Sequence, residues 1–239
     1  MQLAARQLVW NEGWRASGKT VLVIRADAAN MTVKLCTGSL APGSSEVAVD
    51  WGDGTVERFP NLNGCMHTYA RERDYGVKIS DDLSSFGFTS GNPGDVRYRD
   101  MLIELVSLGR KVTSITGYGF NNCHNLRGVI NLPNVTSIGG YAFGSTSGIT
   151  DFIFPAMKRL TQISFYCAPS PAQIHADNVM QIDAEFWEFY GRHLHDVYLR
   201  NSSCEQILAM SGFPFCAGAS DRFHGSDGIV LGNGTIIQE

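Results

Sequence analysis

Apolar and polar residues alternate from Thr20 to about Ser80, in short runs separated by turn residues. Val47, Val49 and Trp51 would share one face of a strand, because successive side chains in a strand point to opposite faces. Such alternation is typical of sheets that bury one face. The runs that predict strands are VLVIRA from Val21, MTVKLCTGS from Met31, EVAVDW from Glu46, TVERF from Thr55 and YGVKIS from Tyr75.

The Gly52-Asp53-Gly54 segment between two of these runs predicts a tight hairpin, because glycine accepts the positive φ that such turns require. Asp50 and Asp53 bring two carboxylates to this turn. They could serve a Ca²⁺ ion or an acid/base pair. We favour the simpler interpretation, in which each accepts hydrogen bonds from the turn's own backbone.

Three motifs follow one another in this region: VDWGDGT from Val49, MHTYA from Met66 and YGVKI from Tyr75. Together they resemble the polycystic-kidney-disease (PKD) type of immunoglobulin-like domain. The resemblance implies two packed antiparallel sheets and a role as a spacer or adhesive module. His67 would lie in the second of these strand motifs and make a structural hydrogen bond.

An internal repeat begins further along the chain. Val112–Ile115 reads VTSI, as does Val135–Ile138, and the aromatic triplets Tyr118–Phe120 and Tyr141–Phe143 keep the same offset of 23 residues. A period between about 20 and 29 residues is typical of leucine-rich repeat solenoids. Each unit is too small to bury its own apolar side chains, so neighbouring units must stack.

Two details of the repeat can be stated from its spacing. Pro133 and Pro155 lie 22 residues apart, so the first copy carries one extra residue, which a bulge or loop would absorb. Weaker copies are predicted from Leu160 (LTQI) and from Val179 (VMQI). The side chains expected to stack in the core are Ile115, Phe120, Leu126, Val129 and Leu132 upon Ile138, Phe143, Ile149, Phe152 and Phe154.

The form VTSIGGYAF, followed by a turn of small residues and by I-x-x-F-x-F-P, resembles the BspA-like leucine-rich repeats of bacterial surface proteins. Cys123 occupies the position of that family's cysteine. The resemblance covers about residues 100 to 200. It implies a solenoid that contacts a host or bacterial surface protein or a glycan.

The expected fold is therefore mainly β, with an immunoglobulin-like β-sandwich followed by a short leucine-rich repeat solenoid and a small C-terminal cap. Breaker residues from Ser90 to Asp95 suggest a boundary near Pro93 and a separate core on each side of it. In the cap, Ser202 or Ser203 would begin a short helix and two or three strands would follow from Arg222. The expected units are residues 1–19, 20–92, 96–200 and 201–239.

Composition narrows the classes of function. The chain has 239 residues, with 19 Lys and Arg against 23 Asp and Glu and a net charge of −4. It lacks the basic stripe that nucleic-acid binding requires and the apolar run of about 20 residues that spans a bilayer. No secretory leader is visible, so we weigh an extracellular or cell-surface location against a virion or the cytoplasm.

Metal and cofactor sites find little support in the sequence. His193 and His195 would share a strand face, but a third ligand is not apparent among the scattered histidines. The six cysteines contain no C-x-x-C pair, and no phosphate-binding glycine loop occurs, so neither zinc nor a nucleotide is expected. The pairs Cys36 with Cys65 and Cys204 with Cys216 could form disulfides, but buried free thiols are the favoured interpretation.

A catalytic role is the weaker alternative. The chain has no G-x-S-x-G nucleophile motif. Asp183, Glu185 and Glu188 could serve a carbohydrate-active enzyme if they converged in a cleft, but a solvated charged edge accounts for them equally well.

The outward positions of the repeat strands form the candidate binding surface, because residues between the inward ones point to solvent. Tyrosine and arginine are enriched at interfaces, although a polar strand face can also be merely hydrated. These candidate residues are Asp151, Ile153, Asp196, Tyr198 and Arg200. We expect a non-catalytic surface binding or adhesion protein, with a phage or prophage tail-associated binding protein as the alternative and an enzyme as a further one.

Overall fold

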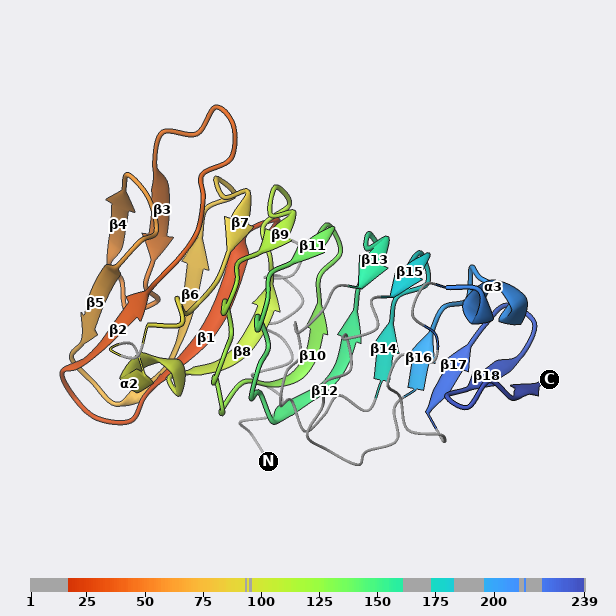
Figure 1. Ribbon diagram of the computed structural model, residues 1–239. Helices are drawn as coiled ribbons and strands as arrows, with labels where there is room; N and C mark the ends of the chain where they lie inside the picture. Colours follow the sequence, from red (N-terminus) through yellow and green to blue (C-terminus); the bar gives the residue numbers. More distant parts are fainter. Residues whose placement is uncertain are drawn as a thin grey trace.

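The computed structural model describes residues 17–92, 94, 96–160, 173–182, 196–210, 213 and 221–238. Its strands form antiparallel layers near the N-terminal end and then a ladder that runs towards the C-terminus (Figure 1). This is the mainly β architecture that the sequence predicts.

The antiparallel part has two sheets. A five-stranded sheet has the order β4-β3-β6-β1-β8, and β2 pairs with β5 in a separate two-stranded sheet. Each run predicted as a strand becomes one. In most of them the apolar positions face the interior and the polar positions face solvent, whereas Val56 on β4 is 63% exposed. The bounds are β1 Thr20–Ala26, β2 Met31–Leu35, β3 Val47–Asp50, β4 Val56–Phe59, β5 Cys65–Tyr69, β6 Arg73–Ile79 and β8 Leu102–Ser107.

A hairpin joins β3 to β4 where the glycines predict it. Gly52 and Gly54 have φ of +80° and +102°, and the backbone N–H of Trp51 donates to the carbonyl of Thr55 over 3.0 Å. Asp50 Oδ1 accepts from the Gly52 N–H at 3.0 Å, and Asp53 Oδ1 accepts from the Thr55 N–H at 2.9 Å. Both aspartates therefore stabilise the turn, as expected.

His67 joins this turn to the neighbouring sheet. Its Nε2 lies 2.8 Å from Asp53 Oδ2, and its ring stacks on the buried Trp51 ring with centroids 4.9 Å apart. Burial alone would raise the pKa of Asp53, but the N–H of Thr55 and the His67 ring bring that pKa below its ordinary value. The Tyr69 hydroxyl donates to the Trp51 carbonyl. The predicted structural hydrogen bond of His67 is confirmed.

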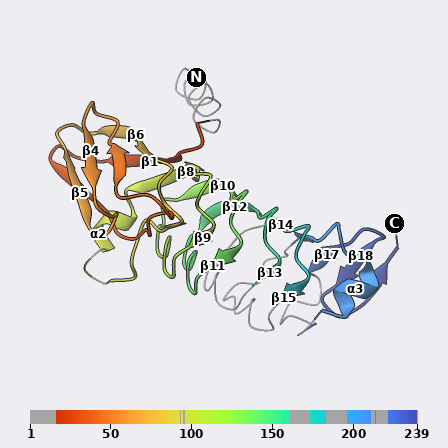
Figure 2. The ribbon, with the colours of Figure 1, turned by 90° about the horizontal axis from the view of Figure 1, so that it is seen from above.

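The ladder consists of two rows of strands on opposite sides of a buried core (Figure 2). One row is a seven-stranded sheet with the order β10-β12-β14-β16-β17-β18-β19, in which neighbours are parallel as far as β17. Its parallel strands are β10 Arg127–Asn131, β12 Gly148–Ile153, β14 Gln173–His175, β16 Asp196–Tyr198 and β17 Arg222–His224. The other row holds two-residue strands: β7 Ser85–Phe86, β9 Ser114–Ile115, β11 Ser137–Ile138, β13 Arg159–Leu160 and β15 Gln181–Ile182.

Side chains from successive repeats stack between the two rows. The Phe120 and Phe143 rings are parallel within 6°, with centroids 5.1 Å apart, and both are fully buried. Phe143 also meets the edge of Phe152 at 4.9 Å. The predicted stacking of equivalent apolar residues is confirmed for these positions.

The prediction for Val129 in that core was wrong. We expected it to point inwards, but it is 45% exposed, whereas Ile130 is fully buried and pairs with Phe152. The pairing of β10 with β12 is irregular between Gly128 and Val129, and Gly128 has a φ of +90°. This irregularity lies before Pro133, where the extra residue predicted a bulge or loop, and it reverses the direction of Val129.

The third repeat also has a different register from the predicted one. Leu160 pairs with Ile182, so it ends the third VTSI-like segment instead of beginning it. Met157 takes the position of Val135 and is buried. The true third segment, Met157–Leu160, reads MKRL. The predicted register was wrong because LTQI resembles VTSI more closely than MKRL does.

The core does not break near Pro93, which corrects the expectation of separate cores. One cluster of buried apolar side chains runs from Leu22 to Val230. Strands also cross the predicted boundary in both directions: β7 pairs with β9, and β8 pairs with β1. A short helix, α2 (Val96–Arg99), lies just before β8. The sandwich and the ladder therefore share strands and apolar packing, while the domain limits stay a prediction.

The C-terminal region closes the ladder. The helix α3 (Cys204–Leu208) begins after Ser203, whose side chain accepts from the backbone N–H of Gln206, while the Gln206 side chain accepts from the backbone N–H of Ser203. This reciprocal arrangement satisfies two free N–H groups of the first turn. After β17, the strands β18 (Ile229–Leu231) and β19 (Ile236–Ile237) pair in antiparallel fashion. The sequence left Ser202 and Ser203 open as the start of the helix, and the structure selects Ser203. The strands after Arg222 are as predicted.

The four cysteines within the described ranges are buried free thiols: Cys36, Cys65, Cys123 and Cys204. Burial raises the pKa of Cys65 and of Cys204 to about 11. Cys36 and Cys65 are therefore not joined, and Cys216 lies outside the described residues.

Candidate functional site

The outward face of the seven-stranded sheet carries side chains in two straight rows, because its parallel strands pair in register. Buried residues such as Phe152, Ile174 and Val197 separate the rows on each strand. The first row is Val129, Asp151, Gln173, Asp196 and Arg222. The second row is Asn131, Ile153, His175, Tyr198 and His224.

Four of the five candidate residues lie in these rows, as the alternation of the strands predicted. Asp151 and Ile153 lie on β12, and Asp196 and Tyr198 lie on β16, with β14 between the two strands. Arg200 follows β16 and is exposed, and its guanidinium carbon lies 4.8 Å from the centroid of the Tyr198 ring. The structure therefore brings all five residues to one surface in two groups.

The second group is built around three rings that we call the ring stack: His175, Tyr198 and His224. The His175 and Tyr198 rings are 4° from parallel, with centroids 4.5 Å apart. The Tyr198 and His224 rings are 14° from parallel, with centroids 4.4 Å apart. Parallel strands hold the three rings at adjacent positions, so the stack follows directly from the register of the ladder.

Asp196 fixes one end of the ring stack. His224 Nε2 lies 2.7 Å from Asp196 Oδ1, and the two side chains are only 21% and 23% exposed. Asp177, in the turn after β14, accepts from the backbone N–H of Arg200 at 3.1 Å. The His224 side chain and the backbone at Arg200 are thus held in place beside Tyr198 before any partner arrives.

Sequence reasoning missed His175 and His224 as members of this surface. His175 follows Ile153 by 22 residues and precedes Tyr198 by 23, which is the repeat offset. That spacing was available in the sequence. It was overlooked because β14 has only three residues and a single buried one, Ile174.

Other sequence-based candidates fall outside the described residues. These are His193 and His195 of the metal hypothesis and Asp183, Glu185 and Glu188 of the enzyme hypothesis. Within the described ranges, no three His, Cys, Asp or Glu side chains come together in a way that could hold a metal ion. None of the helices in the described part of the chain has the length and apolar character needed to cross a bilayer.

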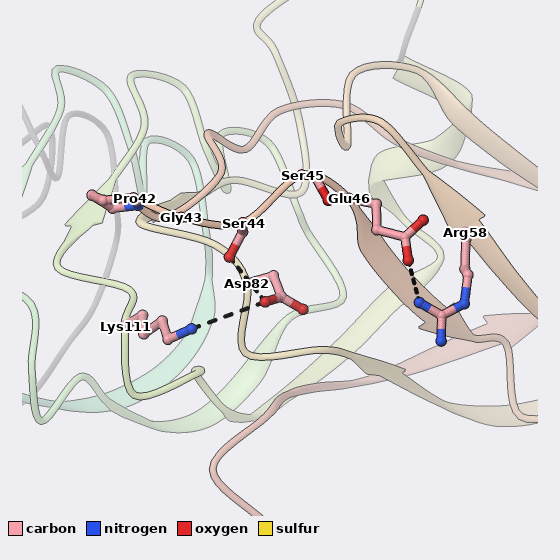
Figure 3. A pocket seen from close by; sticks show the side chains of 8 residues that line it. All are labelled: Pro42, Gly43, Ser44, Ser45, Glu46, Arg58, Asp82 and Lys111. Carbon is pink, nitrogen blue, oxygen red and sulfur yellow. Dashed lines mark hydrogen bonds and ion pairs between the residues drawn. The ribbon is translucent and has the colours of Figure 1, made fainter.

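A polar hollow of about 360 Å³ lies beside the loop that precedes β3 (Figure 3). Its charged side chains are paired with one another: Arg58 with Glu46, and Lys111 Nζ with Asp82 Oδ1 at 3.9 Å. Ser44 also donates to Asp82 at 2.9 Å. Because these groups already satisfy each other, the hollow is a weaker candidate than the sheet face.

A second aromatic pair lies on the turns that follow β9 and β11. The rings of Tyr118 and Tyr141 are 6° from parallel, with centroids 5.2 Å apart, and Tyr118 is 43% exposed. Both residues have a φ near +60°, which is unusual for an aromatic side chain. This pair provides a matched control for the ring stack, because it is similar in chemistry and lies elsewhere.

Strand rows that repeat every 22 or 23 residues around a stacked core define the class of this protein as a repeat solenoid. Comparison with known families agrees with this class. Residues 94–213, half of the chain, match the BspA type leucine rich repeat region in six copies. The chain therefore belongs to the BspA-type leucine-rich repeat family. No curated protein and no solved structure matches it.

Proposed function

We propose that this chain is a non-catalytic binding or adhesion module whose outward sheet face recognises a surface protein or a glycan. The observation that carries the proposal is the ring stack together with the Arg200 guanidinium, whose carbon lies 4.8 Å from the centroid of the Tyr198 ring. Tyrosine and arginine are the residues that most often anchor interfaces. Membership of a repeat family is compatible with this role, since such solenoids typically bind through extended surfaces.

Rigidity supports the proposal. The three rings of the stack are fixed by their mutual stacking, by the Asp196 to His224 contact and by the ladder itself. A partner would therefore lose little affinity to the ordering of these groups, because they are already ordered.

The remaining parts of the proposal concern place and architecture. We propose a cell-surface or extracellular location, with the N-terminal sandwich of PKD type acting as a spacer that holds the solenoid away from its attachment. Two contacts support the PKD type, because together they join the three motifs of the resemblance. The His67 ring stacks on Trp51, and the Tyr69 ring stacks on Tyr75.

A binding screen tests the proposal. Glycans and surface proteins should be screened with the full chain and with Tyr198→Ala and Arg200→Ala, after thermal unfolding has shown that both variants fold. We expect at least one partner whose affinity falls in both variants. A partner that binds all three proteins equally would show that recognition occurs elsewhere.

A further inference from the structure

The ring stack leaves little ring surface for a ligand to contact. Both faces of Tyr198 are covered, one by His175 and the other by His224. A sugar gains affinity from an aromatic residue by lying on its face, where the π electrons are. Tyr198 cannot act as such a platform. It presents its rim and its hydroxyl, flanked by the polar edges of two imidazoles.

The charges around the ring stack depend on the state of the two imidazoles. The charged groups on the surrounding elements are Asp151 on β12, Asp177 after β14, Asp196 on β16, Arg200 after β16 and Arg222 on β17. Three aspartates against two arginines give this set a net charge of −1 when both histidines are neutral. Two protonated imidazoles change it to +1. Histidine ordinarily gains its charge between pH 8 and pH 5.

The positions of these charges matter as much as their sum. The groups that become or remain cationic lie next to Tyr198: the His175 and His224 rings stack against it, and the Arg200 guanidinium carbon lies 4.8 Å from its ring centroid. Asp151 and Asp196 lie in the other row. Acidification therefore creates a line of hydrogen-bond donors with positive charge along the second row.

We propose that this line binds a carboxylate-rich segment of a protein partner in mild acid and releases it at mildly alkaline pH. The inference rests on the proposed function, because it names the partner chemistry and the regulation of the same face. Charge complementarity argues for an anionic partner, and the covered ring faces argue for a peptide rather than a sugar.

The two histidines are not equivalent. His224 contacts Asp196 at 2.7 Å, so part of its charge is neutralised when it is protonated. Among the described residues, no carboxylate forms an ion pair with His175. His175 should therefore contribute more to the attraction of an anion than His224 does.

The test uses a fluorescein-labelled decapeptide of aspartate, whose carboxylates stay ionised at pH 5.5. Its affinity for the full chain is measured by fluorescence polarisation at pH 5.5 and pH 8.0. We expect binding to be roughly five- to thirtyfold tighter at pH 5.5 than at pH 8.0, because two partly exposed imidazoles each contribute a contact with the peptide. Absence of binding at both pH values, or affinity that is independent of pH, overturns the inference.

Three variants separate this account from a general effect of charge. His175→Gln should remove most of the gain in acid, and His224→Gln should remove less of it. Asp151→Asn should tighten binding at pH 5.5, because it removes a negative charge from the neighbouring row and leaves the Asp196 partner of His224 in place. If Asp151→Asn instead weakens binding, the negative charge of that row does not oppose the peptide and the inference fails. Unfolding curves at both pH values provide the control for folding.

Heparin and neutral dextran serve as competitors. Heparin is added at the same concentration of anionic groups as the unlabelled peptide, and dextran at the same concentration of sugar units as heparin. We expect that neither displaces the labelled peptide. If heparin displaces the labelled peptide at a lower concentration than the unlabelled peptide requires, the partner is an acidic polysaccharide and the inference is overturned. The proposed function would still stand in that case. A screen that yields a partner unaffected by Tyr198→Ala and Arg200→Ala would overturn the proposed function itself.

Discussion

The rings of Phe120 and Phe143 are parallel within 6° and 5.1 Å apart at their centroids, although they lie 23 positions apart in the chain. This pair fixes the first two repeats in register. The in-register strands β9 and β11 and the outward rows of the seven-stranded sheet depend on the same alignment.

Removal of either ring from this pair should destabilise the whole array. Phe143→Ala should lower the free energy of unfolding by about 3–5 kcal/mol, because it leaves a cavity in a fully buried stack. Urea denaturation of Phe120→Ala, Phe143→Ala and the double variant measures the coupling. The double variant should lose about 0.5–1.5 kcal/mol less than the sum of the single losses. Strict additivity would mean that the rings do not stabilise each other.

The register at Val129 and Ile130 can be tested with a pair of adjacent substitutions. Val129→Asp should change the free energy of unfolding by no more than about 0.5 kcal/mol, because Val129 lies at the surface. Ile130→Asp should cost several times as much, since it places a carboxylate in the core. Chemical denaturation distinguishes the two. The opposite ranking would restore the arrangement with Val129 inside.

The two glycines of the β3–β4 hairpin have different roles. A Cβ at Gly52 would lie 2.7 Å from the Gly76 carbonyl oxygen, whereas a Cβ at Gly54 would meet nothing within 4 Å. Gly54→Ala should cost about 1–2 kcal/mol, from its positive φ alone. Gly52→Ala adds a steric clash and should cost about 3 kcal/mol or more. Equal losses in thermal unfolding would show that the close approach to Gly76 has no consequence.

The buried thiols should resist modification in the folded protein. At pH 8 very little Cys65 is thiolate, because burial raises its pKa to about 11, and Cys123 is fully buried. Mass spectrometry after iodoacetamide treatment should find both residues unmodified in the native protein. In guanidinium chloride both should react completely. Modification of native Cys123 would indicate that the repeat opens locally.

Much of this fold could be predicted from local patterns. Alternation located the strands of the sandwich, the glycines located the hairpin, and the offset between Tyr118–Phe120 and Tyr141–Phe143 located the repeat. The pair Ser202 and Ser203 located the start of α3 to within one residue. Each of these features depends on residues close together in sequence, so the sequence carries its own signal for it.

Long-range pairing could not be predicted in the same way. Breaker residues near Pro93 indicate that the chain turns, but they do not say that β8 returns to pair with β1. The ring stack was missed for a similar reason. His175 and His224 belong to strands of three residues, and their neighbours in space become known only when the ladder register is known.

The most direct test of the account compares two tyrosines. For a partner identified in the screen, the dissociation constant is measured by calorimetry with the full chain, with Tyr198→Ala and with Tyr118→Ala. We predict that Tyr198→Ala weakens binding by about tenfold or more, because it removes the hydroxyl and the central ring of the stack, and that Tyr118→Ala leaves it unchanged. Loss of binding in Tyr118→Ala, with Tyr198→Ala binding as tightly as the unmodified chain, would contradict the assignment of the outward sheet face as the recognition surface.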